Sequence, residues 1–170
     1  MPSRRQFLKF GLGGGLLLVV AGAVRGERRY VPASGAEPHA VLDAGDRAVL
    51  AAIAPVLLEG AGPVEANPDA VVGSVDRAVA GLPPHLQTEV KQLLALLGSW
   101  PGRRWVAGVR APWGEASGPE IAAFLERWRF SGWRLQQQAY QALHELVFAA
   151  WYARPDTWPA IGYPGPPVLR

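Results

Sequence analysis

The segment WRLQQQAYQALHELVFAAWYA, residues 133–153, is the longest helical pattern in the 170-residue chain and decides its fold. Apolar residues recur in it at spacings of three and four, which places them on one face of a helix. The helix is predicted to end at Arg154, because a residue before proline disfavours the helical conformation. The predicted buried face comprises Leu135, Ala139, Ala142, Leu143, Leu146, Val147, Ala150 and Trp151.

Four shorter helices are predicted upstream. The first starts at the cap Asp43, the second at Asn67-Pro68, the third after Pro84, and the fourth at the capping box Ser117 to Glu120. Their breaks fall at Gly60, Gly81, Gly98 and Ser131-Gly132, and Pro55 predicts a kink or an early second helix. The predicted core positions are Val49, Leu50, Ile53, Val56 and Leu57; Val71, Val72, Val75 and Val79; Leu86, Val90, Leu93, Leu94 and Leu97; and Ile121, Phe124, Leu125 and Trp128.

Residues 99–116 break the helical pattern with tryptophans and arginines. Three readings are open: a loop over the core, a nucleic-acid loop, or a docking surface for a protein, in which Trp and Arg are enriched. The tail from residue 155 to 170 is rich in proline and is predicted to be neither helix nor central strand. It carries large aromatic residues, so it must pack either on its own helices or on a partner.

The chain begins with a pattern typical of a twin-arginine export signal, Ser3, Arg4 and Arg5 followed by Phe7, Leu8 and Lys9. A glycine-rich apolar run, residues 10–24, comes next. It is shorter than the roughly 20 apolar residues that span a bilayer, which favours a signal over an anchor. Residues 1–24 are therefore assigned to the signal, 25–41 to a linker, and 42–170 to one helical domain.

Charge and cysteine content exclude several classes of function. Removing Arg4, Arg5 and Lys9 from the 17 basic residues leaves 14 against 14 acidic ones, so the net charge of +3 belongs to the signal. No basic stripe is left for nucleic acid. With no cysteine, the chain has no disulfide, thiolate metal site or covalent haem attachment.

Candidates for catalysis are few. The three histidines are His39, His85 and His144, and none pairs with another at helical spacing. No phosphate loop, nucleophile elbow or metal-binding HExxH occurs. His144 beside Glu145 is the one acid/base pair that an enzyme could use. We expect no catalytic residue, no metal and no cofactor in this chain.

The segment from Tyr140 to Gly165, above all its ending W-P-A-I-G-Y, resembles the small subunits of membrane-associated flavin dehydrogenases. These include the gluconate 2-dehydrogenase subunit 3 group, which accompanies large flavoproteins of the glucose-methanol-choline type. The resemblance also covers the twin-arginine signal and the helix at 42–58. It implies a small subunit without a cofactor, whose FAD-containing partner leaves the cytoplasm bound to it. The partners it implies are that flavoprotein and the twin-arginine translocase, with a cytochrome c subunit as a further candidate.

These observations predict an all-α domain of about five helices with an irregular tail. The expected function is to bind, stabilise and co-export a flavin dehydrogenase to the periplasm, with membrane contact only through the signal. The alternative is a self-standing periplasmic scaffold or ligand-binding protein. The predicted partner interface comprises Trp100, Arg103, Arg104, Trp105, Trp113, Trp151, Tyr152, Trp158, Ile161 and Tyr163.

Overall fold

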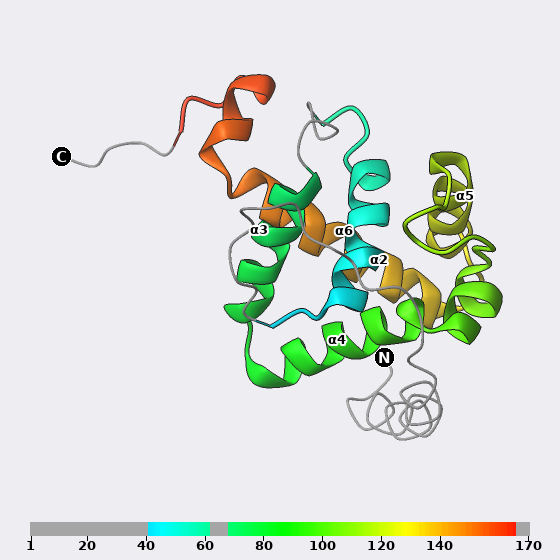
Figure 1. Ribbon diagram of the computed structural model, residues 1–170. Helices are drawn as coiled ribbons and strands as arrows, with labels where there is room; N and C mark the ends of the chain where they lie inside the picture. The colour runs from blue at the N-terminus through cyan, green and yellow to red at the C-terminus, as the bar shows by residue number, and fades with distance from the viewer. Residues whose placement is uncertain (1–40, 62–67, 166–170) are drawn as a thin grey trace.

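The computed structural model describes residues 41–61 and 68–165 (Figure 1). All regular elements in these ranges are helical, which confirms the predicted all-α class. The export signal, the linker before residue 41 and the predicted cap Asn67 lie outside the described residues. The elements are α2 (Ala44–Leu57), α3 (Pro68–Ala80), α4 (Pro84–Gly98), the π-helical turn η2 (Gly102–Ala107), α5 (Gly118–Arg129), α6 (Arg134–Tyr152) and the 3-10 helix η3 (Pro155–Ile161).

Helix α2 lies at the centre and packs against α3, α4, α5 and α6. Asp43 caps it as predicted, accepting from the backbone N–H of Asp46 at 3.0 Å, and the Asp46 carboxylate accepts in return from the N–H of Asp43 at 3.2 Å. The helix continues through Pro55 to Leu57, so the early second helix predicted there does not form. Proline removes one backbone hydrogen bond, and α2 continues despite that loss at Pro55.

The four valines predicted as the buried face of α3, at positions 71, 72, 75 and 79, are all fully buried. Asp76 on the same helix is also buried, and its Oδ1 accepts from the backbone N–H groups of Val41 and Leu42 at 3.0 and 3.1 Å. The start of the domain is thereby bound to α3. From α4, Leu94 and Leu97 reach the core, whereas Leu86, Val90 and Leu93 are only partly buried.

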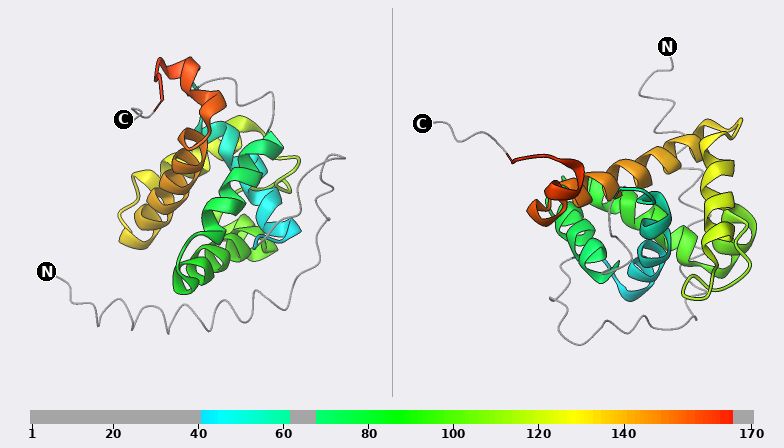
Figure 2. Two further views of the ribbon diagram at one scale, coloured as in Figure 1. Left: turned by 90° about the vertical axis from the view of Figure 1, so that its left-hand side faces the viewer. Right: turned by 90° about the horizontal axis from the view of Figure 1, so that it is seen from above.

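Helices α5 and α6 pack against each other, and α6 also packs along α3. Helix α5 buries all four predicted residues, and the rings of Phe124 and Trp128 meet edge to face at 4.8 Å. The prediction for α6 is wrong at its beginning: Leu135 is 74 % exposed and Ala142 is exposed. Core burial starts at Leu143, and the first turns of α6 project with the end of α5 from the side of the domain (Figure 2).

Candidate partner interface

The stretch after α4, predicted to be irregular, instead forms the π-helical turn η2. Its first residue, Gly102, lies so close to α4 that a Cβ there would be 1.8 Å from the carbonyl oxygen of Leu96. Ser99 joins the two segments, because its Oγ donates to that oxygen at 2.7 Å and accepts from the N–H of Gly102 at 3.1 Å. Glycine therefore lets the chain fold back directly onto the end of α4.

Two residues predicted at the interface lie inside this region of the domain. Arg103 is 3 % exposed, and its Nη1 donates to the carbonyl oxygens of Arg110, at 2.6 Å, and of Ala111. Trp113 is 6 % exposed, and its Nε1 donates to the carbonyl oxygen of Leu97 at 2.9 Å. Trp113 thereby holds the returning loop against α4 and Arg103 holds it against η2. Both side chains are buried, so they offer no surface to a partner, and the prediction for them is corrected.

Two other predicted residues form an exposed cluster, here called the tryptophan pair. Trp100 is 44 % and Trp105 70 % exposed, and their rings meet edge to face at a centroid distance of 4.9 Å. The predicted residue Arg104 lies exposed between them in the sequence. An aromatic pair beside an arginine combines the residue types that dominate protein interfaces.

Helix α5 fixes the turn that presents the tryptophan pair. Arg127 donates from Nη2 to the carbonyl oxygen of Ala107 at 2.6 Å, and Trp128 donates from Nε1 to that of Val106 at 3.3 Å. Ser117 caps α5 as predicted, but Glu120 does not complete the capping box. Its carboxylate accepts instead from the N–H of Arg110 at 2.5 Å, which closes the loop onto α5.

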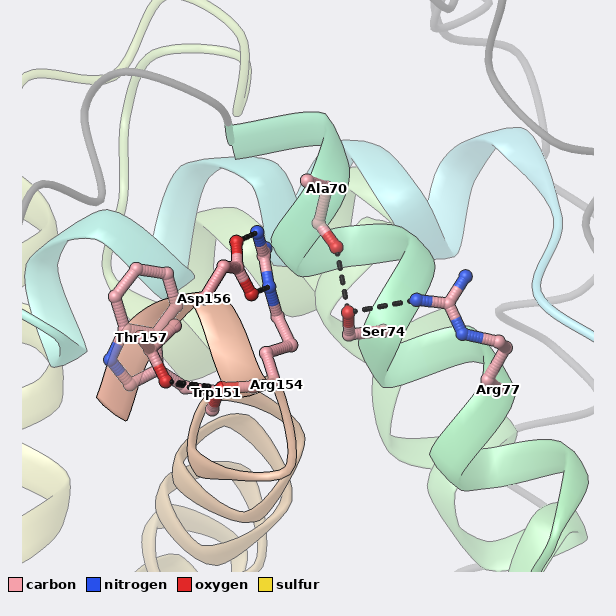
Figure 3. Close-up of polar contacts among 7 residues, drawn as sticks. All are labelled: Ala70, Ser74, Arg77, Trp151, Arg154, Asp156 and Thr157. Carbon is pink, nitrogen blue, oxygen red and sulfur yellow. Dashed lines mark hydrogen bonds and ion pairs between the residues drawn. The ribbon is translucent and has the colours of Figure 1, made fainter. Parts of the chain in front are cut away.

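The tail begins on the buried end of α6 (Figure 3). Trp151, predicted at the interface, is 4 % exposed and therefore belongs to the core. Thr157 is buried, and its Oγ1 donates to the carbonyl oxygens of Trp151 and Arg154 at 3.1 and 2.8 Å. Arg154 pairs with Asp156, and this ion pair lowers the pKa of the Asp156 carboxyl from its ordinary value.

The tail also corrects the expectation that its prolines exclude helix. Residues 155–161 form the 3-10 helix η3, and Pro155 is its first residue. An N–H group at that position would have no acceptor within the helix, so the N–H that proline lacks is not missed. The tail packs on α6 of its own chain. Whether the tail also binds a partner stays a prediction.

The contacts of Trp158 explain why Tyr163, Gly162 and Gly165 stand where they do in the W-P-A-I-G-Y-P-G segment, residues 158–165. Trp158 donates from Nε1 to the carbonyl oxygen of Tyr152 at 2.8 Å, and its ring meets that of Tyr163 edge to face at 5.3 Å. Gly162 turns the chain with a φ of 70°. Gly165, with a φ of 101°, passes so close that a Cβ would be 3.1 Å from the Trp158 ring. Both positions favour glycine.

Folding the tip around Trp158 leaves three predicted interface residues at the surface, here called the tail face. Tyr152 is 38 %, Ile161 47 % and Tyr163 44 % exposed. Trp158 itself is partly buried, and its ring contacts that of Tyr163. The tail face is therefore held by internal hydrogen bonds and ring contacts, although it lies at the end of the described chain.

His144 belongs to a row of rings along α6. It stacks on Phe148 at 4.3 Å and lies 5.8 Å from the ring of Tyr140. The Glu145 carboxylate accepts from Gln141 Nε2 at 2.7 Å. In the ranges 41–61 and 68–165, no three residues with metal-binding side chains are grouped to hold an ion, and no helix is long and apolar enough to cross a bilayer.

Sequence reasoning missed a third exposed group at the junction of α5 and α6, formed by Phe130, Trp133 and Leu135. Its spacing in α6 predicts Leu135 in the core, but the side chain is 74 % exposed. The available signal was the position of Phe130 and Trp133 on either side of Ser131-Gly132, because Ser and Gly mark a turn between helices and turns lie at the surface.

The described residues thus define an all-helical domain that presents fixed aromatic side chains to solvent. Compared with models of known protein families, with curated proteins and with solved structures, the chain has no significant match.

Proposed function

We propose that this chain is the non-catalytic small subunit of a periplasmic flavin dehydrogenase, which it binds, stabilises and co-exports. The observation that supports this most is the tryptophan pair, held exposed by a π-helical turn that Gly102 and α5 fix in place. Exposed tryptophan costs free energy in water, and a fixed aromatic ring loses little conformational entropy on binding. The tail face adds a second surface of the same kind.

The sequence supplies a reason for such a tight interface. The twin arginines Arg4 and Arg5 address a folded cargo to export, and a partner without its own signal must stay bound throughout. In this proposal the FAD lies in the partner and this chain contributes no cofactor. The resemblance of the tail segment to dehydrogenase small subunits suggests a flavoprotein of the glucose-methanol-choline type as that partner.

Export is tested by co-expressing the chain with the flavoprotein encoded beside it and assaying flavin in periplasmic and cytoplasmic fractions. The wild-type chain should move the flavoprotein to the periplasm. The double variant R4K/R5K should leave both proteins in the cytoplasm, because the receptor reads the arginine pair. Export of the flavoprotein with the double variant, or without this chain, would refute the proposal.

The interface is tested separately by copurification. Trp105→Ser and Tyr163→Ser remove exposed rings, and each should weaken the complex at least tenfold, since aromatic hot spots contribute about 2 kcal/mol or more. Gln92→Ala, at an exposed position of α4, is the matched control and should not weaken it. Unchanged affinity in both aromatic variants would show that these surfaces do not bind the flavoprotein.

Deleting the chain from Trp158 onward distinguishes the two roles of the tail. If the tail face binds the partner, the deletion should weaken the complex more than it lowers the melting temperature of the isolated chain. If the deletion mainly lowers the melting temperature, the tail only covers its own helices.

A further inference from the structure

The junction of α5 and α6 is the most exposed apolar group in the described chain. Phe130 is 69 %, Trp133 75 % and Leu135 74 % exposed, and the three lie within six residues of sequence. We call this group the corner. A cluster of large apolar side chains in water marks a binding surface more often than a single exposed residue does.

The corner has a fixed conformation. Ser131 Oγ accepts from the N–H of Trp133 at 3.0 Å and donates to Gln136 Oε1 at 2.6 Å. The carbonyl oxygen of Ser131 accepts from Gln137 Nε2 at 2.7 Å. These bonds tie the connection to the first turn of α6. The exposure of the aromatic rings is therefore part of the folded structure.

The corner is also basic. Arg127, Arg129 and Arg134 lie in it or next to it, and no acidic residue occurs between Arg127 and His144. The guanidinium of Arg129 lies 5.2 Å from the centre of the Phe130 ring. This local excess of positive charge contrasts with the balance of 14 basic and 14 acidic residues after the signal.

The placement of Arg134 conflicts with ordinary helix preferences. It is the first residue of α6, where the helix dipole disfavours a cation, and the first turn contains no acidic residue. The N-cap residue Trp133 makes no side-chain capping hydrogen bond. Residues that break a local rule in this way are expected at binding sites.

The shape of the corner favours a membrane over a protein. Both views in Figure 2 show the end of α5 and the start of α6 projecting from the side of the domain. Protein hot spots lie in the centre of broad, well-packed interfaces, whereas a projecting tip enters a layer of lipid headgroups without a complementary groove. Trp, Phe and Leu favour the boundary of that layer, and arginine is attracted to anionic lipids.

We propose that the corner docks this chain on an anionic phospholipid surface. Phe130, Trp133 and Leu135 enter the headgroup region, and Arg129 and Arg134 bind lipid phosphates. This adds a membrane contact to the one expected from the signal alone. It goes beyond the function proposed above, and its test needs no flavoprotein.

The absence of cysteine allows a clean test with the full chain. Leu135→Cys is labelled with an environment-sensitive fluorophore and titrated with vesicles of phosphatidylglycerol or of phosphatidylcholine. Gln92→Cys, labelled at its exposed position on α4, is the matched control. The signal segment is the same in every variant, so differences between the probe positions report the corner.

The label at position 135 should shift to the blue with phosphatidylglycerol and not with phosphatidylcholine, while the label at position 92 should not shift. Adding R129Q/R134Q should raise the lipid concentration for half of the shift about 25-fold, because each of the two arginines near an anionic surface strengthens binding about fivefold. Circular dichroism should show that these surface variants remain folded.

Three results would overturn the proposal. They are no shift at position 135, an equal shift at both labelled positions, and an equal response to the two lipids. A shift at position 135 that is produced by the purified flavoprotein and not by vesicles would instead assign the corner to the protein interface.

Discussion

Gly102→Ala should separate the π-helical turn from α4. A Cβ at this position would lie 1.8 Å from the Leu96 carbonyl oxygen, 2.7 Å from its carbon and 2.9 Å from Ser99 Oγ. Real Cβ atoms do not approach closer than 3.0 Å, so backbone must move by at least 1.2 Å, the difference between 3.0 and 1.8 Å. The obstacle is backbone, which no side-chain rotation can relieve.

The cost follows from what that movement breaks. Overpacking costs about 1–3 kcal/mol, and the two hydrogen bonds of Ser99 at the junction contribute about 1 kcal/mol each. We therefore expect Gly102→Ala to lower the free energy of unfolding by about 3–5 kcal/mol. The tryptophan pair should lose its fixed arrangement as well, because Trp100 and Trp105 flank the displaced residue.

Urea unfolding followed by circular dichroism measures this effect. Gly114→Ala is the matched control, because a Cβ there meets nothing within 4 Å and its φ is not positive. The control should change stability by no more than about 0.5 kcal/mol. If Gly102→Ala is equally mild, the close approach of η2 to α4 is wrong, and so is the account of how the tryptophan pair is held.

Three further variants test other contacts. Burial lowers the pKa of Arg47, and the attraction of the buried Asp76 carboxylate opposes that shift. Asp76→Ala removes this carboxylate and should lower the free energy of unfolding in urea by about 3 kcal/mol. Asp76→Asn retains a side-chain oxygen that can accept hydrogen bonds, so it should cost less. Thr157→Val should cost about 1 kcal/mol, seen as a lower melting temperature, because it leaves η3 without its hydroxyl bonds. The Arg154 pair lowers the pKa of Asp156, so its contribution is present above the ordinary value of 3.8 and is lost as pH falls through the lowered pKa. Asp156→Asn lacks the pair at every pH, so the ratio of the wild-type to the variant rate of cleavage by pepsin should rise toward one as pH falls through that range.

The positions of the helices were largely predictable. The valine stripe of α3, the cap Asp43 and the buried face of α5 are local patterns, and all are confirmed. Such patterns determine whether a helix forms and which side is apolar. Local patterns do not determine how much of the apolar side is covered by a neighbouring helix. Leu135 therefore fits the period of α6 and is nevertheless exposed.

The candidate surfaces were less predictable, because they depend on contacts between segments. The composition of residues 99–116 indicated Trp and Arg but not which would be buried. Arg103 lies inside because several backbone carbonyl oxygens converge on it, whereas Arg104 next to it is exposed. A π-helical turn has no sequence period of its own. The turn is held by contacts between segments, namely the close approach of Gly102 to Leu96 and the bonds from Arg127 and Trp128.

The bonds from Asp76 to the N–H groups of Val41 and Leu42 also have a mechanical consequence. They fix the point at which the preceding chain leaves the domain. A pull on that chain is shared between the backbone that leads into α2 and the two hydrogen bonds to the middle of α3, whose valines lie in the core. Force applied from the amino-terminal side is thus received in part by a helix whose four valines are fully buried.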